Sequence, residues 1–330
     1  MNWLITGGCG FLGSSLIRRL LADGGHSIRV IDNLSVGTLA DLAKVCEFDE
    51  FTRENLLENF TPGRVQFILG DILEEKLAID VGQGVDVIVH FAANTGVGPS
   101  VENPRQDCVT NVIGTLNYLE SARLNSIKRF VFASSGAPVG ECMPPIHEEM
   151  VPHPVSPYGA SKLAGEGYCS AYFRTFKVET VALRFGNVYG PGSVHKNSVV
   201  AKFIKLALNG ETLEIYGNGE QTRDFIYIDD LVRAVYLAAV KSGVGGEIFQ
   251  IASASETSVG EITKELQSIF TEAGLDNVVA RHGEWRVGDV KRNFSDTSKA
   301  EKMLDWKPLV PRQVGLKKTF DWFDILVSRI

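Results

Sequence analysis

The stretch Thr6-Gly7-Gly8-Cys9-Gly10-Phe11-Leu12-Gly13, near the start of the 330-residue chain, decides the fold. It follows a short apolar run at residues 3–5 that is typical of a strand, and it opens a helical pattern at residues 11–21. The first glycine permits a tight turn, the second lets the backbone approach a diphosphate, and the third lets the helix pack on the strand. The N-terminus of such a helix supplies N–H groups and a positive dipole for phosphates.

Asp32 strengthens this interpretation. It ends the next strand-like run, residues 28–31, about 20 residues beyond the glycines, where a carboxylate accepts hydrogen bonds from the adenosine ribose of a dinucleotide. The same carboxylate repels a 2′-phosphate, which favours NAD over NADP. Glycine turns and strand-end aspartates are each common in ordinary loops, so the prediction of an NAD site depends on their order in the chain.

The remainder of the first half alternates short apolar runs with longer helical patterns. Strand-like runs occupy residues 65–69, 85–90, 130–133 and 179–183, and helical patterns occupy 111–122 and 158–176. This alternation predicts βαβ units and a mostly parallel sheet that is covered on both faces.

The pattern is more mixed after Arg184. A helical pattern spans 199–208, and an Asn218-Gly219 turn separates two strand-like runs within 213–225. Asp229 and Thr257 are the predicted N-caps of the next two helices.

These patterns together predict an α/β protein with a Rossmann-type, doubly wound parallel sheet and a smaller mixed α/β substrate-binding lobe. We expect residues 1–184 to form the NAD-binding domain, with a return segment near 226–250. Residues 185–225 and 251–330 are expected to form the lobe that binds the substrate.

Composition is that of a folded globular protein, with 44% apolar and 22% charged residues. A net charge of -7 argues against nucleic acid as the main partner. The five cysteines show no CxxC spacing, so we expect neither a disulfide framework nor a metal site. The N-terminal residues do not form a secretory leader, and no segment reaches the roughly 18 apolar residues of a membrane span, so we expect a cytoplasmic protein that does not enter a membrane.

A group of reactive side chains lies in the middle of the chain. Ser134-Ser135 ends the run 130–133, and Tyr158-Gly159-Ala160-Ser161-Lys162 opens the helical pattern 158–176. Tyr158 and Lys162 project from one helical face, and the ammonium is expected to bring the pKa of the phenol, ordinarily about 10, toward neutrality. Such a tyrosine can act as general base and acid on a hydroxyl group, whose oxygen Ser135 can also hydrogen-bond. At this spacing alone, tyrosine and lysine most often form a plain helix surface.

In this order, the motifs resemble the extended short-chain dehydrogenase/reductase family of NAD-dependent nucleotide-sugar epimerases and dehydratases, and within it the UDP-glucose (UDP-galactose) 4-epimerases. Asp71-Ile72 and His90-Phe91-Ala92-Ala93 add to the likeness, which covers nearly the whole chain. It implies that Ser135, Tyr158 and Lys162 are catalytic. The residues that it places around NAD are Gly7, Gly10, Phe11, Leu12, Gly13, Asp32, Asn33, Ser35, Gly37, Asp71, Ile72, Phe91, Ala92, Ala93, Asn111, Tyr158, Lys162, Phe185 and Val188.

The resemblance also implies a nucleotide-diphosphate sugar, most often UDP-linked, as the substrate. Arg223 and Arg286 match two arginines that the family brings to the diphosphate, whose oxygens suit guanidinium forks, although either arginine alone could be a surface ion pair. Asn293 replaces a large aromatic found in some family members and would admit a bulkier sugar. The implied substrate residues are Ser135, Tyr158, Asn187, Val199, Tyr216, Arg223, Arg286, Asp289 and Asn293.

Gly136 and Ala137 narrow the reaction. Dehydratases of the family carry an acidic pair at these places and UDP-glucuronate decarboxylases a glutamate at the second, whereas glycine and alanine move no proton. We therefore expect 4-epimerisation through a 4-keto sugar, with a decarboxylase, a reductase or a non-catalytic dinucleotide sensor as alternatives. Val139 stands where the family usually has tyrosine. By the same resemblance, the helices at 111–122 and 158–176 are expected to form a homodimer.

Overall fold

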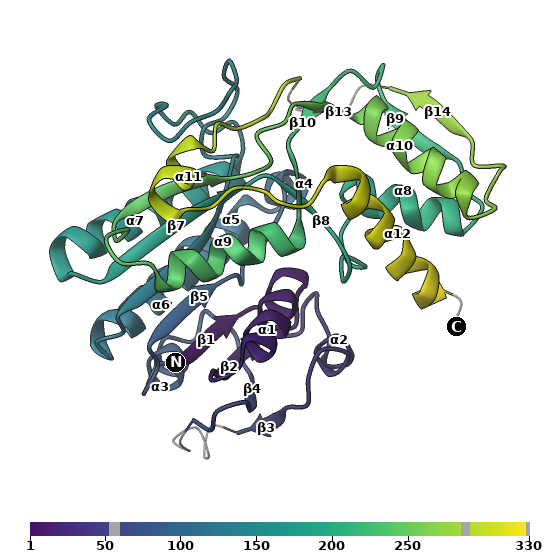
Figure 1. Ribbon diagram of the computed structural model, residues 1–330. Helices are drawn as coiled ribbons and strands as arrows, with labels where there is room; N and C mark the ends of the chain where they lie inside the picture. The colour runs from purple at the N-terminus through teal and green to yellow at the C-terminus, as the bar shows by residue number, and fades with distance from the viewer. Residues whose placement is uncertain (53–59, 285–290, 328–330) are drawn as a thin grey trace.

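The computed structural model describes residues 1–52, 60–284 and 291–327. Its centre is an eight-stranded sheet in which every neighbouring pair is parallel, in the order β12-β7-β6-β5-β1-β2-β4-β3. This sheet confirms the predicted Rossmann-type fold (Figure 1). Its strands are β1 (Asn2–Thr6), β2 (Ser27–Asp32), β3 (Asp49–Phe51), β4 (Val65–Leu69), β5 (Val87–His90), β6 (Arg129–Ser135), β7 (Glu179–Phe185) and β12 (Glu247–Ile251).

The strand order reverses between β1 and β5. After β1 the chain places β2, β3 and β4 on one side, with β3 at the edge, and it then returns to place β5, β6, β7 and β12 on the other side. Ligands of open parallel sheets bind at such a switch point, beyond the carboxyl ends of the strands. The glycine turn after β1 and the serine that ends β6 both lie at this edge of the sheet.

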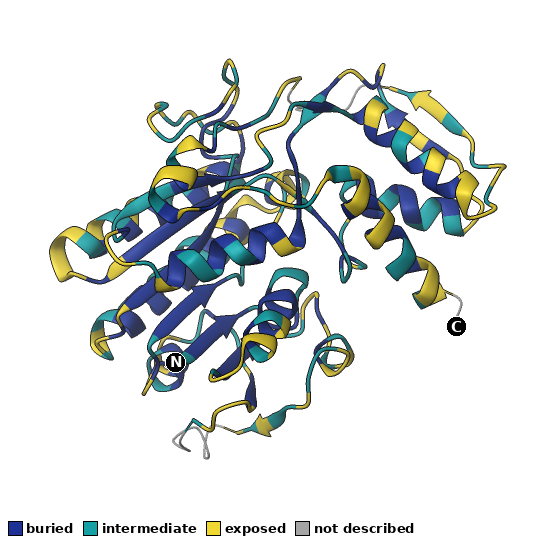
Figure 2. Ribbon diagram, viewed as in Figure 1, coloured by how far each residue is buried: buried dark blue, intermediate teal, exposed yellow. Residues whose placement is uncertain are grey.

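Helices cover both faces of the sheet. α1 (Phe11–Asp23) and α9 (Ile228–Val240) cover one face, and α3 (Glu75–Val81), α6 (Gly114–Leu124) and α7 (Pro157–Phe176) cover the other. Trp3 and Ile5 belong to the first core, whereas Leu4 between them belongs to the second. Side chains alternate between the faces of a strand, so a continuous apolar run indicates a strand buried on both sides. The buried interior of the sheet and the exposed outer faces of the helices are visible in Figure 2.

A smaller group of elements lies beyond this edge of the sheet, at the upper right of Figure 1. The first core cluster continues into it without interruption, through Ile204, Leu266 and Phe320. Its elements are the helices α8 (Val199–Leu208), α10 (Val259–Glu272) and α12 (Arg312–Val327), and the pairs β8 (Asn187–Tyr189) with β11 (Phe225–Tyr227), β9 (Leu213–Tyr216) with β14 (Ala280–Gly283), and β10 (Thr222–Arg223) with β13 (Thr257–Ser258).

Short helices complete the described chain: α2 (Leu39–Ala43), α4 (Val97–Glu102), α5 (Pro104–Cys108), the π-helix η1 (Val109–Ile113) and α11 (Ser298–Leu304). The predicted helix 111–122 is therefore two elements, because a π-helical turn that contains Asn111 precedes α6. π-helical turns are rare and occur frequently at functional sites.

Three predicted details of the second half differ from the structure. The Asn218-Gly219 turn is present, with Gly219 at φ +78°, but the runs on its two sides pair with distant strands rather than with each other. The N-cap of α9 is Tyr227, and Asp229 lies in the first turn of that helix. Ser258 caps α10 in place of Thr257, since Ser258 and Glu261 form a reciprocal capping box.

Two further observations concern the described residues. No helix among them is both long enough and apolar enough to cross a membrane. Within those same ranges, no cluster of three His, Cys, Asp or Glu side chains could hold a metal ion, and all five cysteines have free thiols.

Candidate active site

The turn between β1 and α1 requires glycine for steric reasons. Gly7 has φ +69°, and its N–H donates to the Ile31 carbonyl at 2.8 Å. A Cβ at Gly13 would lie 2.4 Å from the Gly7 oxygen, so the third glycine allows α1 to start directly against the turn. A Cβ at Gly37, in the loop after β2, would lie 2.3 Å from the Cys9 oxygen, so this loop also approaches the glycine turn closely.

Gly10 differs from its neighbours. A Cβ there would meet only the Gly7 oxygen, at 3.2 Å, so internal packing demands glycine less strictly at this position. Gly10 is the N-cap of α1, and within the described residues no side chain caps this helix and no acid stands in its first turn. An uncapped helix start with an open backbone fits a diphosphate. Phe11 and Leu12, also predicted here, are partly buried in the first turn of α1.

Asp32 is oriented by two backbone N–H groups. Cys9 donates to one carboxylate oxygen at 3.0 Å and Leu34 donates to the other at 2.9 Å. Burial raises the pKa of Asp32, and these two hydrogen bonds oppose the rise. Each oxygen keeps a further lone pair, so the carboxylate can also accept the two hydroxyls of a ribose.

Two connected segments form the predicted binding site for the adenine end of NAD. The Asn33 side chain donates to Asp71 at 2.9 Å, and its own oxygen accepts from the backbone N–H of Ser35 at 3.1 Å. Ile72 is buried, and its carbonyl accepts from Asn117 of α6 at 2.9 Å. The structure therefore joins the residues after β2 to those after β4 by direct contacts.

Asn111 supports the loop at which we expect the nicotinamide end of NAD to bind. Its oxygen accepts from the N–H of Asn94 at 2.7 Å, and its amide nitrogen lies 3.0 Å from the Ser161 hydroxyl and 3.1 Å from an Asp107 oxygen. The π-helical turn thus ties the loop after β5 to α7. Phe91, Ala92 and Ala93 form that loop and are only partly buried; the Ala92 N–H donates to the Thr6 hydroxyl at 3.1 Å.

The structure brings the three predicted catalytic side chains together. Ser135 is the last residue of β6, and α7 begins at Pro157, with Ser156 as its N-cap. Ser135 hydrogen-bonds the hydroxyl of Tyr158. Lys162 lies one helical turn further along, with its ammonium 5.9 Å from the centre of the Tyr158 ring.

The electrostatics differ from the expectation of a lowered tyrosine pKa. Burial raises the pKa of Tyr158 to about 12; the hydrogen bond from Ser135 opposes this rise and the charge of Asp107 adds to it. Burial also lowers the pKa of Lys162 to about 8. The Lys162 ammonium donates to the Ala133 carbonyl at 2.8 Å rather than to the phenol. Burial therefore has a larger effect on the pKa of Tyr158 than the lysine charge has.

The predicted substrate residues come from several elements. Phe185 ends β7, and Asn187 and Val188 belong to β8, where the Asn187 N–H donates to the Asp224 carbonyl at 2.7 Å. Val199 starts α8, and Tyr216 ends β9, where the Lys202 ammonium reaches its hydroxyl at 3.4 Å.

Asn293 lies against the catalytic strand end, since its amide nitrogen would be 3.9 Å from a Cβ placed at Gly136. Arg223 is partly buried in β10. Arg286 and Asp289 lie outside the described residues.

Sequence reasoning missed the buried acids that organise this region. The Asp224 carboxylate accepts from the N–H groups of Ser253, Ala254 and Ser295 and also from the Ser253 hydroxyl. It thereby joins β11 to the segment that carries Asn293. Its position directly after Arg223 could have marked Asp224 as part of the site, but its hydrogen-bond partners are distant in sequence.

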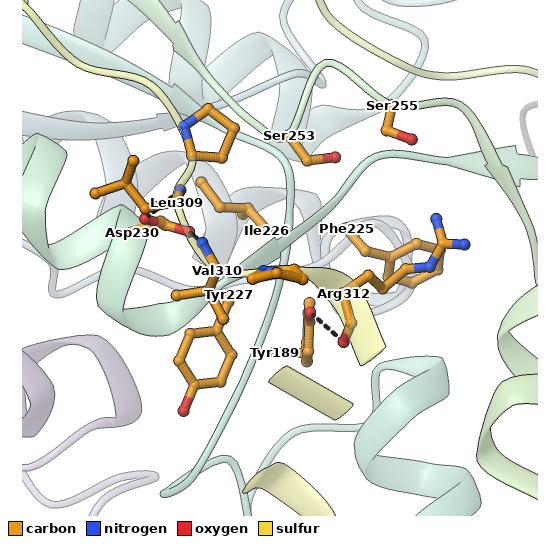
Figure 3. A pocket seen from close by; sticks show the side chains of 12 residues that line it. Tyr189, Phe225, Ile226, Tyr227, Asp230, Ser253, Ser255, Leu309, Val310 and Arg312 are labelled. Carbon is orange, nitrogen blue, oxygen red and sulfur yellow. Dashed lines mark hydrogen bonds between the residues drawn. The ribbon is translucent and has the colours of Figure 1, made fainter. Parts of the chain in front are cut away.

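A separate pocket of about 350 Å³ opens beside the start of α9 (Figure 3). In it the Tyr189 hydroxyl donates to the Arg312 carbonyl, and the Asp230 carboxylate accepts the N–H groups of Leu309 and Val310 at 2.9 Å. None of the residues predicted to bind cofactor or substrate lines this pocket, so the candidate active site is a different region.

The fold and these side chains define an NAD-binding enzyme of the extended short-chain dehydrogenase/reductase class. The sequence matches the model of the NAD dependent epimerase/dehydratase family over residues 3–252. The chain belongs to this family, which confirms the predicted cofactor, NAD.

Relatives within the family include both epimerases and dehydratases. A UDP-glucose 4-epimerase of Mycolicibacterium smegmatis is 35% identical over 98% of each chain. The crystal structure of a UDP-glucose 4-epimerase from Thermotoga maritima with UDP-glucose has a TM-score of 0.88 at 34% identity, and the match covers 99% of this chain and 100% of that one. A dTDP-glucose 4,6-dehydratase from Streptomyces venezuelae, solved with NAD bound, has a TM-score of 0.87 at 31% identity over 100% and 98% of the two chains.

Proposed function

We propose that this enzyme catalyses the NAD-dependent 4-epimerisation of a nucleotide-diphosphate sugar, a UDP-hexose such as UDP-glucose or UDP-galactose or the N-acetyl or uronate analogue. The observation that carries the proposal is the contact between Ser135 and Tyr158 at the strand edge, next to two residues that cannot transfer a proton, Gly136 and Ala137. The epimerases among the relatives support the same reaction.

In this mechanism the chain's own residues position one hydroxyl and move one proton. Tyr158 removes the proton of the C4 hydroxyl, and Ser135 hydrogen-bonds the same oxygen. Bound NAD supplies the hydride acceptor, and later the donor, at C4. Lys162 contributes a buried positive charge that favours the phenolate, the form of Tyr158 that accepts this proton. The 4-keto sugar then turns, and Tyr158 returns the proton.

The residues around position 136 distinguish epimerisation from dehydration. Elimination of water requires an acid and a base beside the sugar in addition to Tyr158. Gly136 and Ala137 supply neither, and the nearby Asn293 amide has no proton to give at neutral pH. We assign Asn187, Val199, Tyr216, Arg223, Arg286, Asp289 and Asn293 to substrate binding, and we assign the two arginines to the diphosphate.

A substrate panel tests this proposal. UDP-glucose, UDP-N-acetylglucosamine, UDP-glucuronate and dTDP-glucose are each incubated with the purified enzyme, and the products are identified by NMR while NADH absorbance is recorded. We expect inversion at C4 in at least one sugar without net NADH. Loss of water or of carbon dioxide, or stoichiometric consumption of NADH, would instead assign a dehydratase, decarboxylase or reductase; no turnover with any sugar would favour a dinucleotide sensor.

We also propose a cytoplasmic homodimer formed through α6 and α7, with the predicted division into an NAD-binding domain and a substrate lobe. Large apolar side chains are exposed on these helices, including Leu124 at 51% and Phe176 at 48%. These side chains would be covered if the two helices pair with a second copy of the chain, as the family resemblance implies. Light scattering tests the assembly, and a monomer at micromolar concentration would exclude it.

A further inference from the structure

The end of β6 and the first half of α7 are joined by three consecutive contacts. Helical residues at intervals of four point toward the strand, and each meets one of three successive strand residues. The contacts are Ser135 with the Tyr158 hydroxyl, the Ala133 carbonyl with the Lys162 ammonium at 2.8 Å, and the Ser134 hydroxyl with the Glu166 carboxylate at 2.6 Å. The first two involve the proposed catalytic residues, and the third involves a residue that the mechanism does not use.

Glu166 is held from the other side by Arg184 of β7. The guanidinium donates to both carboxylate oxygens, at 2.8 and 2.7 Å, and both side chains are 2% exposed. Arg184 is also the cross-strand neighbour of Ser134. Among the described residues, its third nitrogen, Nη1, has no hydrogen-bond partner. The carboxylate therefore connects α7, β6 and β7 at one buried point.

A buried ion pair is weak evidence for stability. The desolvation of two charges largely offsets their attraction, and well-packed apolar residues often stabilise a fold equally well. The place of this pair is more informative, because it lies one helical turn beyond Lys162 and beside the strand residue next to Ser135. Removal of one partner would leave a single charge in the low-dielectric interior close to the Lys162 ammonium.

We propose that Glu166, fixed by Arg184, is a positioning residue of the catalytic site. It holds the end of β6 in register with α7, so that Ser135 meets Tyr158, and it balances the charge around Lys162. The kinetic part of this inference rests on the proposed epimerase reaction, whereas the electrostatic part does not.

The surroundings of Lys162 support this role. Burial lowers the pKa of Lys162 to about 8, and the negative charges of Asp107 and Glu166 act against that fall. The titratable groups that face Lys162 are Asp107 on α5, Tyr158, Glu166 and Cys169 on α7, and His90 on β5. Of the two carboxylates, only Glu166 is paired with an arginine, so its partner can be removed without altering the carboxylate itself.

The direct test measures Lys162 in the intact protein by NMR. The protein is labelled with ¹³C at the lysine Cε, the Lys162 signal is assigned with Lys162→Arg, and its pKa is determined in three variants. Glu166→Gln leaves Arg184 unpaired, and the pKa of Lys162 falls by about one unit or more. Arg184→Gln leaves the carboxylate unpaired, and the pKa of Lys162 rises. The pKa of Lys162 in the double variant lies between its values in the two single variants.

A kinetic test follows where the substrate panel has identified a substrate. The alkaline limb of kcat moves to lower pH in Glu166→Gln and to higher pH in Arg184→Gln, while KM stays within about twofold. Ser134→Ala removes one hydrogen bond to a charged group, so kcat falls at least about tenfold at an unchanged pKa of Lys162. If kcat in Ser134→Ala equals that of the unchanged enzyme, Glu166 does not hold the register of β6.

A matched control exists at the other end of the same two strands. Arg129 of β6 and Glu179 of β7 form an ion pair at 2.7 Å, remote from the catalytic residues along both strands. Glu179→Gln should leave the pKa of Lys162 and the pH profile unchanged. The charge-balancing role is refuted if Glu166→Gln and Arg184→Gln shift the pKa of Lys162 in the same direction or do not shift it at all. The double variant removes both charges together, so a result remains available if one single variant does not fold.

Discussion

Gly10→Ala separates cofactor binding from folding. Gly10 has φ -76° and ψ 172°, a conformation open to alanine, and the new Cβ would meet only the Gly7 oxygen at 3.2 Å. The exchange should change the free energy of unfolding of the NAD-free protein by less than about 1 kcal/mol. The same methyl group would project where the backbone approaches the diphosphate. Loss of one or two charge-assisted hydrogen bonds there corresponds to a ten- to hundredfold increase in the Kd for NAD, about 1.4 kcal/mol for each factor of ten.

Gly13→Ala is the matched comparison. Its Cβ would lie 2.4 Å from the Gly7 oxygen and 2.5 Å from the Gly8 Cα, so the backbone must move, at a cost of about 1–3 kcal/mol to folding. Copurified nucleotide is removed, NAD binding is measured by calorimetry, and thermal unfolding is recorded without NAD. If Gly10→Ala binds NAD within twofold of the unchanged protein, the glycine turn is not the diphosphate site.

Three further outcomes are expected. Tyr158→Phe should lower the interconversion rate at least about a hundredfold and leave NAD bound, and full activity in this variant would exclude the proton-transfer role. Asp32→Asn should weaken NAD binding about tenfold and reduce the preference for NAD over NADP, as measured by calorimetry with both nucleotides. An unchanged preference would contradict the contact between Asp32 and the ribose. Burial raises the pKa of Asp41, but hydrogen bonds from neighbours including His195 lower it to about 2, from 3.8. The contribution of Asp41 to the free energy of unfolding is therefore present above pH 3.8 and is lost as the pH falls toward 2. Asp41→Asn should flatten the pH dependence of the free energy of unfolding by about 1–2 kcal/mol in that interval, and an unchanged slope in acid titrations would refute this.

The nucleotide-binding half was predictable because its signals are local. The glycine turn, Asp32 and the apolar runs each occupy a few consecutive residues, and their periods correspond directly to strands buried on both faces. The second half was predicted less well. Its short strands pair with partners far along the chain, as β9 does with β14, and no periodicity encodes such a choice.

The candidate site shows the same division. Ser135, Tyr158 and Lys162 were predicted from their order in the chain and from the family resemblance. The raised pKa of Tyr158 was not predicted, because the degree of burial depends on the packing of α5, α7 and β6 together. The roles of Asp224 and Glu166 were likewise not evident, since each carboxylate is defined by donors from other elements.

The sequence by itself determined the class of the sheet and the place of the glycine turn, and it supplied the candidate reactive side chains, because these patterns depend on neighbours within one or two turns of chain. Only the tertiary structure decided which strands meet at the switch point, that a π-helical turn holds Asn111 against α7, and that Arg184 pairs with Glu166 one helical turn beyond the lysine. These contacts arise between residues distant in sequence, and their energies depend on water being excluded when the chain packs.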